Sequence, residues 1–252
     1  MAKLTTWAAR SATGQVRKGN QDAAYAGQYL VAVADGMGGH VAGDVASLEA
    51  INALADFDAE TEPAELVQAL SNGVAAANAA IRQRGELEPG LRTMSTTLTA
   101  MLWSGRSYGI AHIGDSRAYR LRAGQLRQLT EDHAYRNLVS GAAAIEDIAP
   151  VMSRFLDGRA DRSPDLDTRQ ALPRDRYLLC SDGLTAVVPG TAIREELSAT
   201  HGLAVIADRL IDLADSAGSP DNITVIVIDV AADDAPSIPT PVVYLGSAAA
   251  RG

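Results

Sequence analysis

Five aspartates stand where apolar segments of the sequence begin or end. Asp35 follows the run YLVAVA, Asp115 follows GIAHIG, and Asp182 follows YLLCS. Asp221 precedes NITVIVI, and Asp22 precedes the short segment AAY. Aspartate is unfavourable in strands, and a role in turns explains one such residue more readily than five. Carboxylates gathered at the rims of strands therefore predict a site that binds a cation.

The spacing of two of these acids predicts a direct pairing. A hairpin centred between residues 28 and 29 places Asp22 opposite Asp35 on neighbouring strands. Like charges in that position destabilise the strand pair, and each carboxylate raises the pKa of the other. A divalent cation removes both problems. Because the donors are oxygens with no Cys or His cluster, the set favours Mg²⁺ or Mn²⁺ over Zn²⁺.

Glycines accompany the acids in the segments DGMGGH, GDS and SDG. Glycine allows a backbone to approach a ligand closely, so that a carbonyl oxygen in such a turn can coordinate a metal. The DGMGGH turn follows an apolar run and opens a helical pattern, but it lacks the Lys-Ser/Thr ending of a nucleotide-binding P-loop. These turns therefore favour metal binding.

The segments that must position the aspartates have the pattern of one layered domain. Apolar stretches predict strands at residues 5–12, 29–34, 97–103, 107–113, 118–122, 125–129, 177–180 and 223–230. Helical spacing predicts a helix at 41–54 and a second from about Pro63 that Gly85 and the Pro89-Gly90 pair end. It also predicts helices at 191–197, with Thr191 as N-cap, and at 203–213, with Gly218 beyond its end. Short turns between strands mean antiparallel pairing, which together with the helices predicts an α+β fold.

Composition limits the classes of function. The chain has 252 residues, of which 47% are hydrophobic, and a net charge of −9. This charge argues against a nucleic-acid partner. The single cysteine fits a reducing compartment, and neither a signal peptide nor a membrane segment is evident. We expect a soluble, cytoplasmic protein with a domain at 1–232 and a C-terminal tail at 233–252.

Seven blocks of the sequence resemble the metal-dependent type 2C (PPM) serine/threonine protein phosphatases, in their bacterial branch. They are RKGNQD (17–22), VADGMGGHVAGDVAS (33–47), STTLTA (95–100), IGDSRAYRL (113–121), LTEDH (129–133), LLCSDGL (178–184) and DNITVIVI (221–228). The blocks occur in the order of the family and reach about Val230. The resemblance implies a four-layer αββα sandwich, in which two antiparallel β-sheets are flanked by helix pairs.

The resemblance also implies a set of metal ligands. Asp35 would bridge two core ions of Mn²⁺ or Mg²⁺, and the carbonyl of Gly36 would complete the second site. Asp182 and Asp221 would hold the first ion. Asp115 would share a third, weaker ion with Asp182. Residues 134–172, which are irregular and match the family poorly, would form a flap beside this site.

Three further residues receive catalytic roles from the resemblance. Arg17 would grip the substrate phosphate, and Asp22 would hydrogen-bond to metal-bound water. His40 is a candidate general acid for the leaving alkoxide, with a role in orienting the turn as its alternative. We expect Asp132 and His133, in the LTEDH block, to be structural.

The implied activity is hydrolysis of phosphoserine and phosphothreonine by direct attack of a metal-bridging water. The substrates would be phosphorylated proteins, either targets of a cognate Ser/Thr kinase or the kinase itself, and the protein would act as a monomer without a membrane or nucleic-acid partner. A catalytically weak or inactive relative that binds phosphoproteins as a regulator is the alternative. The net charge of −9 argues against a phosphodiesterase or nuclease.

Overall fold

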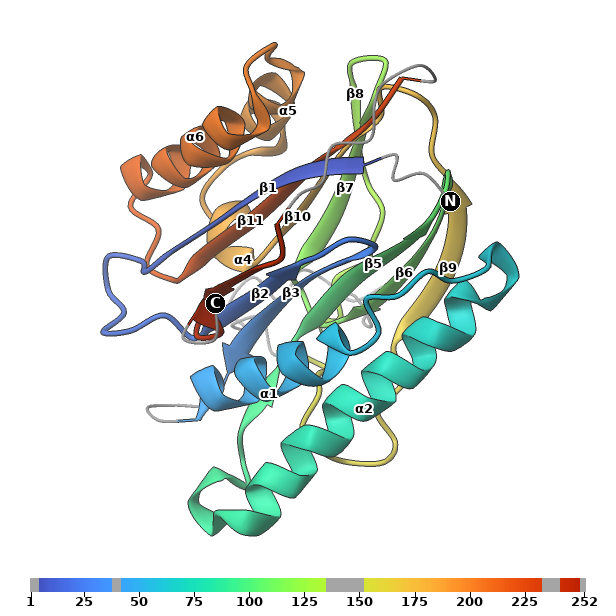
Figure 1. The fold of residues 1–252 in the computed structure, drawn as a ribbon. Coiled ribbons are helices and arrows are strands. Elements are labelled where there is room, and N and C mark those ends of the chain that lie inside the picture. Colours follow the sequence, from blue (N-terminus) through green and yellow to red (C-terminus); the bar gives the residue numbers. More distant parts are fainter. Residues whose placement is uncertain (1–4, 38–41, 135–151, 233–240, 250–252) are drawn as a thin grey trace, which may run out of the picture.

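The computed structural model describes residues 5–37, 42–134, 152–232 and 241–249. These residues form two antiparallel sheets that face each other, with helices on both outer faces (Figure 1). The predicted four-layer αββα sandwich is therefore confirmed.

The first sheet is built around the most apolar strand of the sequence. Its order is β1 (Thr5–Ala12), β11 (Ile223–Val230), β10 (Arg176–Cys180), β7 (Arg117–Arg122) and β8 (Gln125–Gln128). Successive side chains of a strand point to opposite faces. Accordingly, Val225 and Val227 of β11 pack towards the helices, whereas Ile226 and Ile228 pack between the two sheets. This double burial explains the continuous apolar run of β11.

The second sheet carries the predicted hairpin. Its order is β12 (Val243–Gly246), β2 (Asp22–Ala26), β3 (Leu30–Met37), β5 (Leu98–Ser104), β6 (Ser107–Ile113) and β9 (Asp165–Gln170), with β4 (Ser95–Thr96) paired to β3. Most described residues of β2, β3, β5 and β6 are buried, because this sheet has helices on one face and the first sheet on the other.

Helix pairs cover the outer faces, as Figure 1 shows. The second sheet is covered by α1 (Gly43–Ala55) and α2 (Leu66–Leu87), with the short 3₁₀ turns η1 (Pro63–Glu65) and η2 (Pro89–Leu91) beside them. The first sheet is covered by α4 (Asp182–Thr185), α5 (Gly190–Ser198) and α6 (Leu203–Ser216). Within the described ranges, every helix is too short or too polar to cross a bilayer.

One predicted helix start is wrong, and one predicted end is refined. Helix α2 ends at Leu87, between Gly85 and Pro89, and Gly85 is buried inside it where the backbone of Arg92 approaches. Helix α5 begins at Gly190 after Pro189, whose carbonyl accepts the first helical hydrogen bonds, so Thr191 lies inside the helix and is not its cap. Gly218 lies beyond the end of α6 with φ of +74°, as its position predicts.

Two strands occur in segments where none was expected. Strand β9 lies within the irregular segment 134–172 and pairs with β6 at the edge of the second sheet. Strand β12 lies within 233–252, the segment expected as a tail, and pairs with β2. Most residues of β9 are exposed and those of β12 are half-buried, so neither has the alternating pattern that identifies a strand.

Candidate active site

The hairpin formed by β2 and β3 brings the first two acids together. Asp22 lies directly opposite Asp35, and Ala23 lies opposite Ala34, so the predicted register is confirmed. At the other end of the hairpin, the Asp58 carboxylate accepts hydrogen bonds from the backbone of the turn. The register that pairs the two acids is therefore fixed from the turn end of the hairpin.

The other three acids reach the same place from different strands. Asp115 follows β6, Asp182 opens α4 directly after β10, and Asp221 precedes β11. Burial raises the pKa of Asp35 well above its ordinary value, and the charges of the four other aspartates raise it further. The structure thus brings together the five acids that sequence spacing singles out, from both sheets.

Asp22 is the most completely enclosed of these acids. Its Oδ2 accepts hydrogen bonds from Ser181 Oγ at 2.8 Å and from Thr224 Oγ1 at 2.7 Å. Burial raises the pKa of Asp22 to about 7, although these two hydroxyls favour its charged form. Sequence analysis missed both hydroxyl residues, which lie 159 and 202 positions away from Asp22 along the chain.

Three carboxylate oxygens of the cluster bear on whether it can bind a cation. The Oδ1 atoms of Asp22, Asp115 and Asp182 are buried, and none has a hydrogen-bond partner among the described residues. Burial, and then the charge of Asp182, raises the pKa of Asp115 to about 7. A buried oxygen without a donor is costly unless something positive compensates it, and hard oxygen donors suit Mg²⁺ or Mn²⁺. The donor set therefore fits a divalent cation.

Arg17 lies at the rim of this cluster, where it pairs with one of the acids. Its Nε donates to Asp221 Oδ1 at 2.8 Å, and its Nη2 donates to Asp221 Oδ2 at 2.6 Å. With the side chains in these positions, no group of three His, Cys, Asp or Glu residues in the described part of the chain is arranged to hold a metal ion. With both its oxygens turned to Arg17, Asp221 would have to reorient to serve as a ligand.

Gly36 occupies a position that no side chain could share. A Cβ atom on this residue would lie 2.1 Å from the carbonyl oxygen of Gly43 and 2.5 Å from that of Gln21. Its backbone N–H donates to Gln21 at 3.2 Å, and Ser47 Oγ donates to the same carbonyl at 2.6 Å. The turn after Asp35 is therefore packed tightly against the start of α1. His40 lies outside the described residues.

Side chains beside the acids hold their loops. Asn222 Oδ1 accepts a hydrogen bond from the backbone N–H of Gln21 at 2.9 Å. Thr97 Oγ1 accepts from the N–H of Asp35 at 3.0 Å and lies 2.9 Å from Ser116 Oγ. Through these contacts, Asn222 and Ser116 support the loops that carry the acids.

The C-terminal strand also contacts the site. The backbone N–H of Ser247 donates to the carbonyl of Asp22 at 2.7 Å, and Ala248 is fully buried. Gly246 has φ of +65°, and a Cβ atom there would lie 2.1 Å from the same carbonyl oxygen. The end of β12 therefore buttresses the backbone of Asp22.

Comparisons with known proteins agree with this geometry. The family model for protein phosphatase 2C matches residues 13–212. Serine/threonine protein phosphatase PstP of Mycobacterium tuberculosis is 46% identical over 239 residues, which cover 91% of this chain and 46% of that protein. Serine/threonine phosphatase stp of Listeria monocytogenes is 37% identical over 236 residues, which cover 87% of this chain and 94% of that protein. The chain thus spans about half the length of PstP.

A solved structure shares the fold. The catalytic domain of PstP, in complex with two manganese ions, has a TM-score of 0.84 to this chain at 46% identity, covering 90% of this chain and 99% of that chain. The matched family model spans the hairpin, the Asp115 turn and the segment of Asp182. Sequence, fold and the gathering of acids thus agree, and the chain belongs to the protein phosphatase 2C family.

Proposed function

We propose that this chain is a metal-dependent serine/threonine protein phosphatase that hydrolyses phosphoserine and phosphothreonine. The observation that carries the proposal is the gathering of five aspartates from both sheets, with buried, unpartnered oxygens, beside the guanidinium of Arg17. The relatives described above are serine/threonine phosphatases, which favours this activity over that of an inactive regulator.

Mn²⁺ or Mg²⁺ is the proposed cofactor, in keeping with the two manganese ions of the PstP catalytic domain. Asp35, the Gly36 carbonyl, Asp182 and Asp221 are the proposed ligands of two core ions, and Asp115 with Asp182 would hold a weaker third. When bound, such ions supply Lewis acidity and lower the pKa of coordinated water.

The chain's own groups would supply binding and orientation. The Arg17 guanidinium is about half-exposed and already makes a two-point contact with a carboxylate, which is the geometry that suits two phosphoryl oxygens. Asp22 Oδ1 would accept a hydrogen bond from the attacking water, with the carboxylate fixed by Ser181 and Thr224. His40 remains the proposed general acid for the leaving alkoxide.

The proposed substrates are phosphorylated proteins, among them targets of a serine/threonine kinase in the same cell or the kinase itself. We place the protein in the cytoplasm as a monomer. The sequence favours a catalytic domain at 1–232 with a flap at about 134–172, but β12 of the segment 233–252 pairs with β2, so we propose that this segment belongs to the same domain.

The experiment compares hydrolysis of a phosphothreonine peptide and of p-nitrophenyl phosphate with and without Mn²⁺. Asp35→Asn and Asp182→Asn should each lower the Mn²⁺-dependent turnover by at least ~100-fold, because metal activation of water is the main rate effect. Asp212→Asn, on the exposed face of α6, removes the same charge away from the site and should leave turnover unchanged. Turnover near the wild-type value in Asp35→Asn would contradict the proposal.

A further inference from the structure

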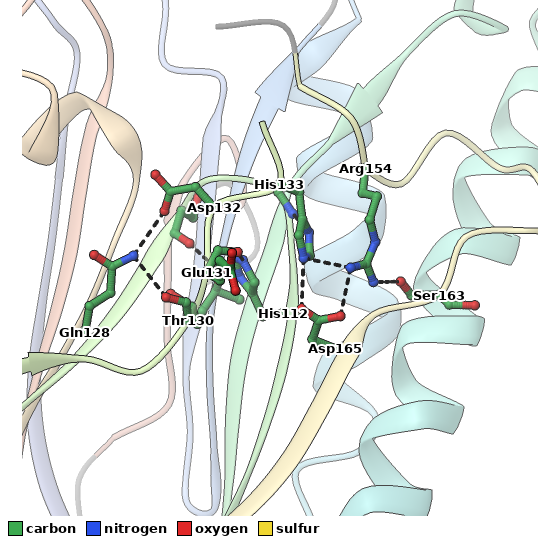
Figure 2. A network of polar contacts seen from close by, with 12 residues as sticks. His112, Gln128, Thr130, Glu131, Asp132, His133, Arg154, Ser163 and Asp165 are labelled. Atoms are coloured by element: carbon green, nitrogen blue, oxygen red, sulfur yellow. Dashed lines mark hydrogen bonds and ion pairs between the residues drawn. The ribbon is translucent and has the colours of Figure 1, made fainter. Parts of the chain in front are cut away.

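A polar network beside the Asp115 turn includes residues that the proposed reaction does not use. It is buried at His112 and His133 and reaches the surface at Arg154 and Asp165. Figure 2 shows His133 with Arg154 and Asp165 on one side and His112 on the other. His133 is buried, and it is the last residue of the LTEDH block that follows β8. Its contacts reach three separate segments of the chain.

The first contact is a reciprocal pair with Gly114. The backbone N–H of His133 donates to the carbonyl of Gly114 at 2.8 Å. The backbone N–H of Gly114 donates to His133 Nδ1 at 3.0 Å. Gly114 has φ of +120°, and a Cβ atom there would lie 2.5 Å from Thr97. The residue before Asp115 is thus fixed between Thr97 and the His133 ring.

The second contact is with β9. Nδ1 accepts from Gly114, and Nε2 lies 2.9 Å from Asp165 Oδ2 and 2.8 Å from Arg154 Nη1. Arg154 Nη1 donates to Asp165 Oδ1 at 2.8 Å, and its Nη2 donates to the carbonyl of Ser163. Asp165 therefore holds the imidazole and the guanidinium together.

The third contact is with the segment that follows residue 151. The backbone N–H of Ser153 donates to the carbonyl of His133 at 2.7 Å. Three residues further on, Leu156 and Thr96 exchange two backbone hydrogen bonds of 2.9 and 3.0 Å. One histidine therefore joins this segment to the turn that carries Asp115.

The ring of His112 packs against the ring of His133, and its own hydrogen bonds hold it in place. Its centroid lies 4.8 Å from that of His133, with 37° between the ring planes. Its Nδ1 lies 2.9 Å from Thr99 Oγ1, and its Nε2 lies 3.0 Å from the carbonyl of Glu131. Burial, and then the proximity of His133, lowers the pKa of His112 to about 4, so this ring stays neutral.

We infer that His133 is a positioning residue that sets the Gly114–Asp115 turn relative to residues 152–165, through Nδ1 on Gly114 and Nε2 on Asp165. The inference rests on the proposed phosphatase function. Its consequence is that the two ring nitrogens have separable tasks. A histidine that serves only to fill the core would have no such division.

Three substitutions of His133 separate the effects of its two ring nitrogens. In His133→Asn the amide oxygen can replace Nδ1 as the acceptor for Gly114, but the side chain is too short for Asp165. In His133→Gln the longer amide can reach Asp165 in place of Nε2, but it leaves Gly114 without its acceptor. His133→Leu removes both contacts. Asp167→Asn is the matched control, because Asp167 is exposed on β9 and pairs locally with Arg169.

Four quantities are measured for each variant: kcat and KM for p-nitrophenyl phosphate, Mn²⁺ binding by calorimetry, hydrogen exchange at the Gly114 amide, and Tm. His133→Leu and His133→Gln should lower kcat and speed Gly114 exchange, each by roughly 10-fold, as expected for one lost buried hydrogen bond. Both should weaken Mn²⁺ binding at the weakest site. His133→Asn should stay within about 3-fold of the wild type, and KM should be unchanged throughout.

Two results would overturn the inference. One is equal loss of kcat in the Asn, Gln and Leu variants with parallel loss of Tm, which describes a residue that only supports the core. The other is wild-type kcat and Mn²⁺ binding in His133→Leu while Gly114 exchange rises. If the wild type itself shows no Mn²⁺-dependent turnover, the proposed function fails, and the inference is judged by exchange and Mn²⁺ binding alone.

Discussion

At the scale of residues, Arg17 has one observed partner, Asp221, and one proposed partner, the substrate phosphoryl group. Its guanidinium holds both oxygens of Asp221, and the proposed reaction requires it to hold a phosphoryl group. The side chain is 48% exposed, so the contact with Asp221 is screened by water and is easily exchanged.

Arg17→Ala should reduce kcat/KM for p-nitrophenyl phosphate by roughly 10- to 100-fold, because one charge-assisted, bidentate contact to the phosphoryl group is lost. Mn²⁺ binding, measured by calorimetry, should not weaken, since Asp221 is then released from its pair. A collapse of Mn²⁺ affinity would show that Arg17 holds Asp221 in place. Arg10→Ala, which removes a cation from an exposed pair with Asp208, is the control.

A second ion pair predicts how stability depends on pH. Burial alone would raise the pKa of Asp175, but hydrogen bonds from Arg122, the Leu172 amide and the Tyr177 hydroxyl outweigh it and hold the pKa below its usual value. A depressed carboxyl pKa contributes stability above the unfolded-state pKa of about 3.9, and this is lost as the pH falls through the folded-state value.

Asp175→Asn should therefore lower the free energy of unfolding by roughly 3 kcal/mol at pH 7. The difference from the wild type should shrink as the pH falls below about 4. Urea unfolding at several pH values measures both effects. Asp208→Asn, in a pair whose side chains are 40% and 53% exposed, should cost about 0–1 kcal/mol. An Asp175→Asn deficit that is constant from pH 7 to acid would contradict the assignment.

At the scale of elements, the hairpin of β2 and β3 decides whether Asp22 and Asp35 meet. A slip of one residue would turn the side chains of one strand to the other face. The turn is fixed by Asp58, which follows α1 and accepts backbone N–H groups of Gln28 and Tyr29 at 2.8 and 2.6 Å. It also accepts from the Tyr25 hydroxyl at 2.7 Å.

Asp58→Ala should lower the free energy of unfolding by about 2–4 kcal/mol, because several hydrogen bonds to one carboxylate are lost together. Phosphatase turnover should fall as well, because a looser pairing of β2 with β3 separates Asp22 from Asp35. Asp56→Ala, two residues earlier and exposed, is the matched control and should change stability by less than about 0.5 kcal/mol. Equal effects of the two substitutions would show that Asp58 does not fix the turn.

Sequence patterns predicted β11 from its continuous apolar run and α6 from its helical apolar spacing. They also predicted the pairing of Asp22 with Asp35, which follows from turn symmetry. They did not predict β9, because an exposed edge strand of sequence DLDTRQ needs no apolar alternation. They also could not supply Ser181 and Thr224, since a hydroxyl that bonds Asp22 across more than 150 residues leaves no local pattern. The contacts of His133 with Gly114 and Asp165 likewise leave no pattern in the sequence.

At the scale of the whole molecule, both sheets join distant parts of the chain. Strand β1 pairs with β11, so that Thr5 lies opposite Val230. Strand β12 pairs with β2, and its end supports the carbonyl of Asp22. The C-terminal strand is thus an integral part of the sheet that carries two of the acids.

Gly246→Ala should destabilise the fold and reduce turnover, because a Cβ atom would collide with the Asp22 carbonyl and force β12 away. Gly218→Ala is the matched control, since Gly218 has a similar φ of +74° but open space around it. The control should lose about 1–2 kcal/mol of stability from backbone strain alone, with turnover unchanged. Equal turnover in the two variants would show that β12 does not support Asp22.

The pairing of β1 with β11 and of β2 with β12 has a consequence for synthesis on the ribosome. Translation delivers residues in order, and pairings between distant segments form slowly because a long loop must close first. The partner of β1 leaves the ribosome more than 200 residues after it. Asp22, Asp35 and Asp115 therefore emerge well before Asp182, Asp221 and the strands that complete both sheets. A nascent chain that ends before β10 carries three of the five acids without the site, so the proposed activity can begin only when translation has passed β12.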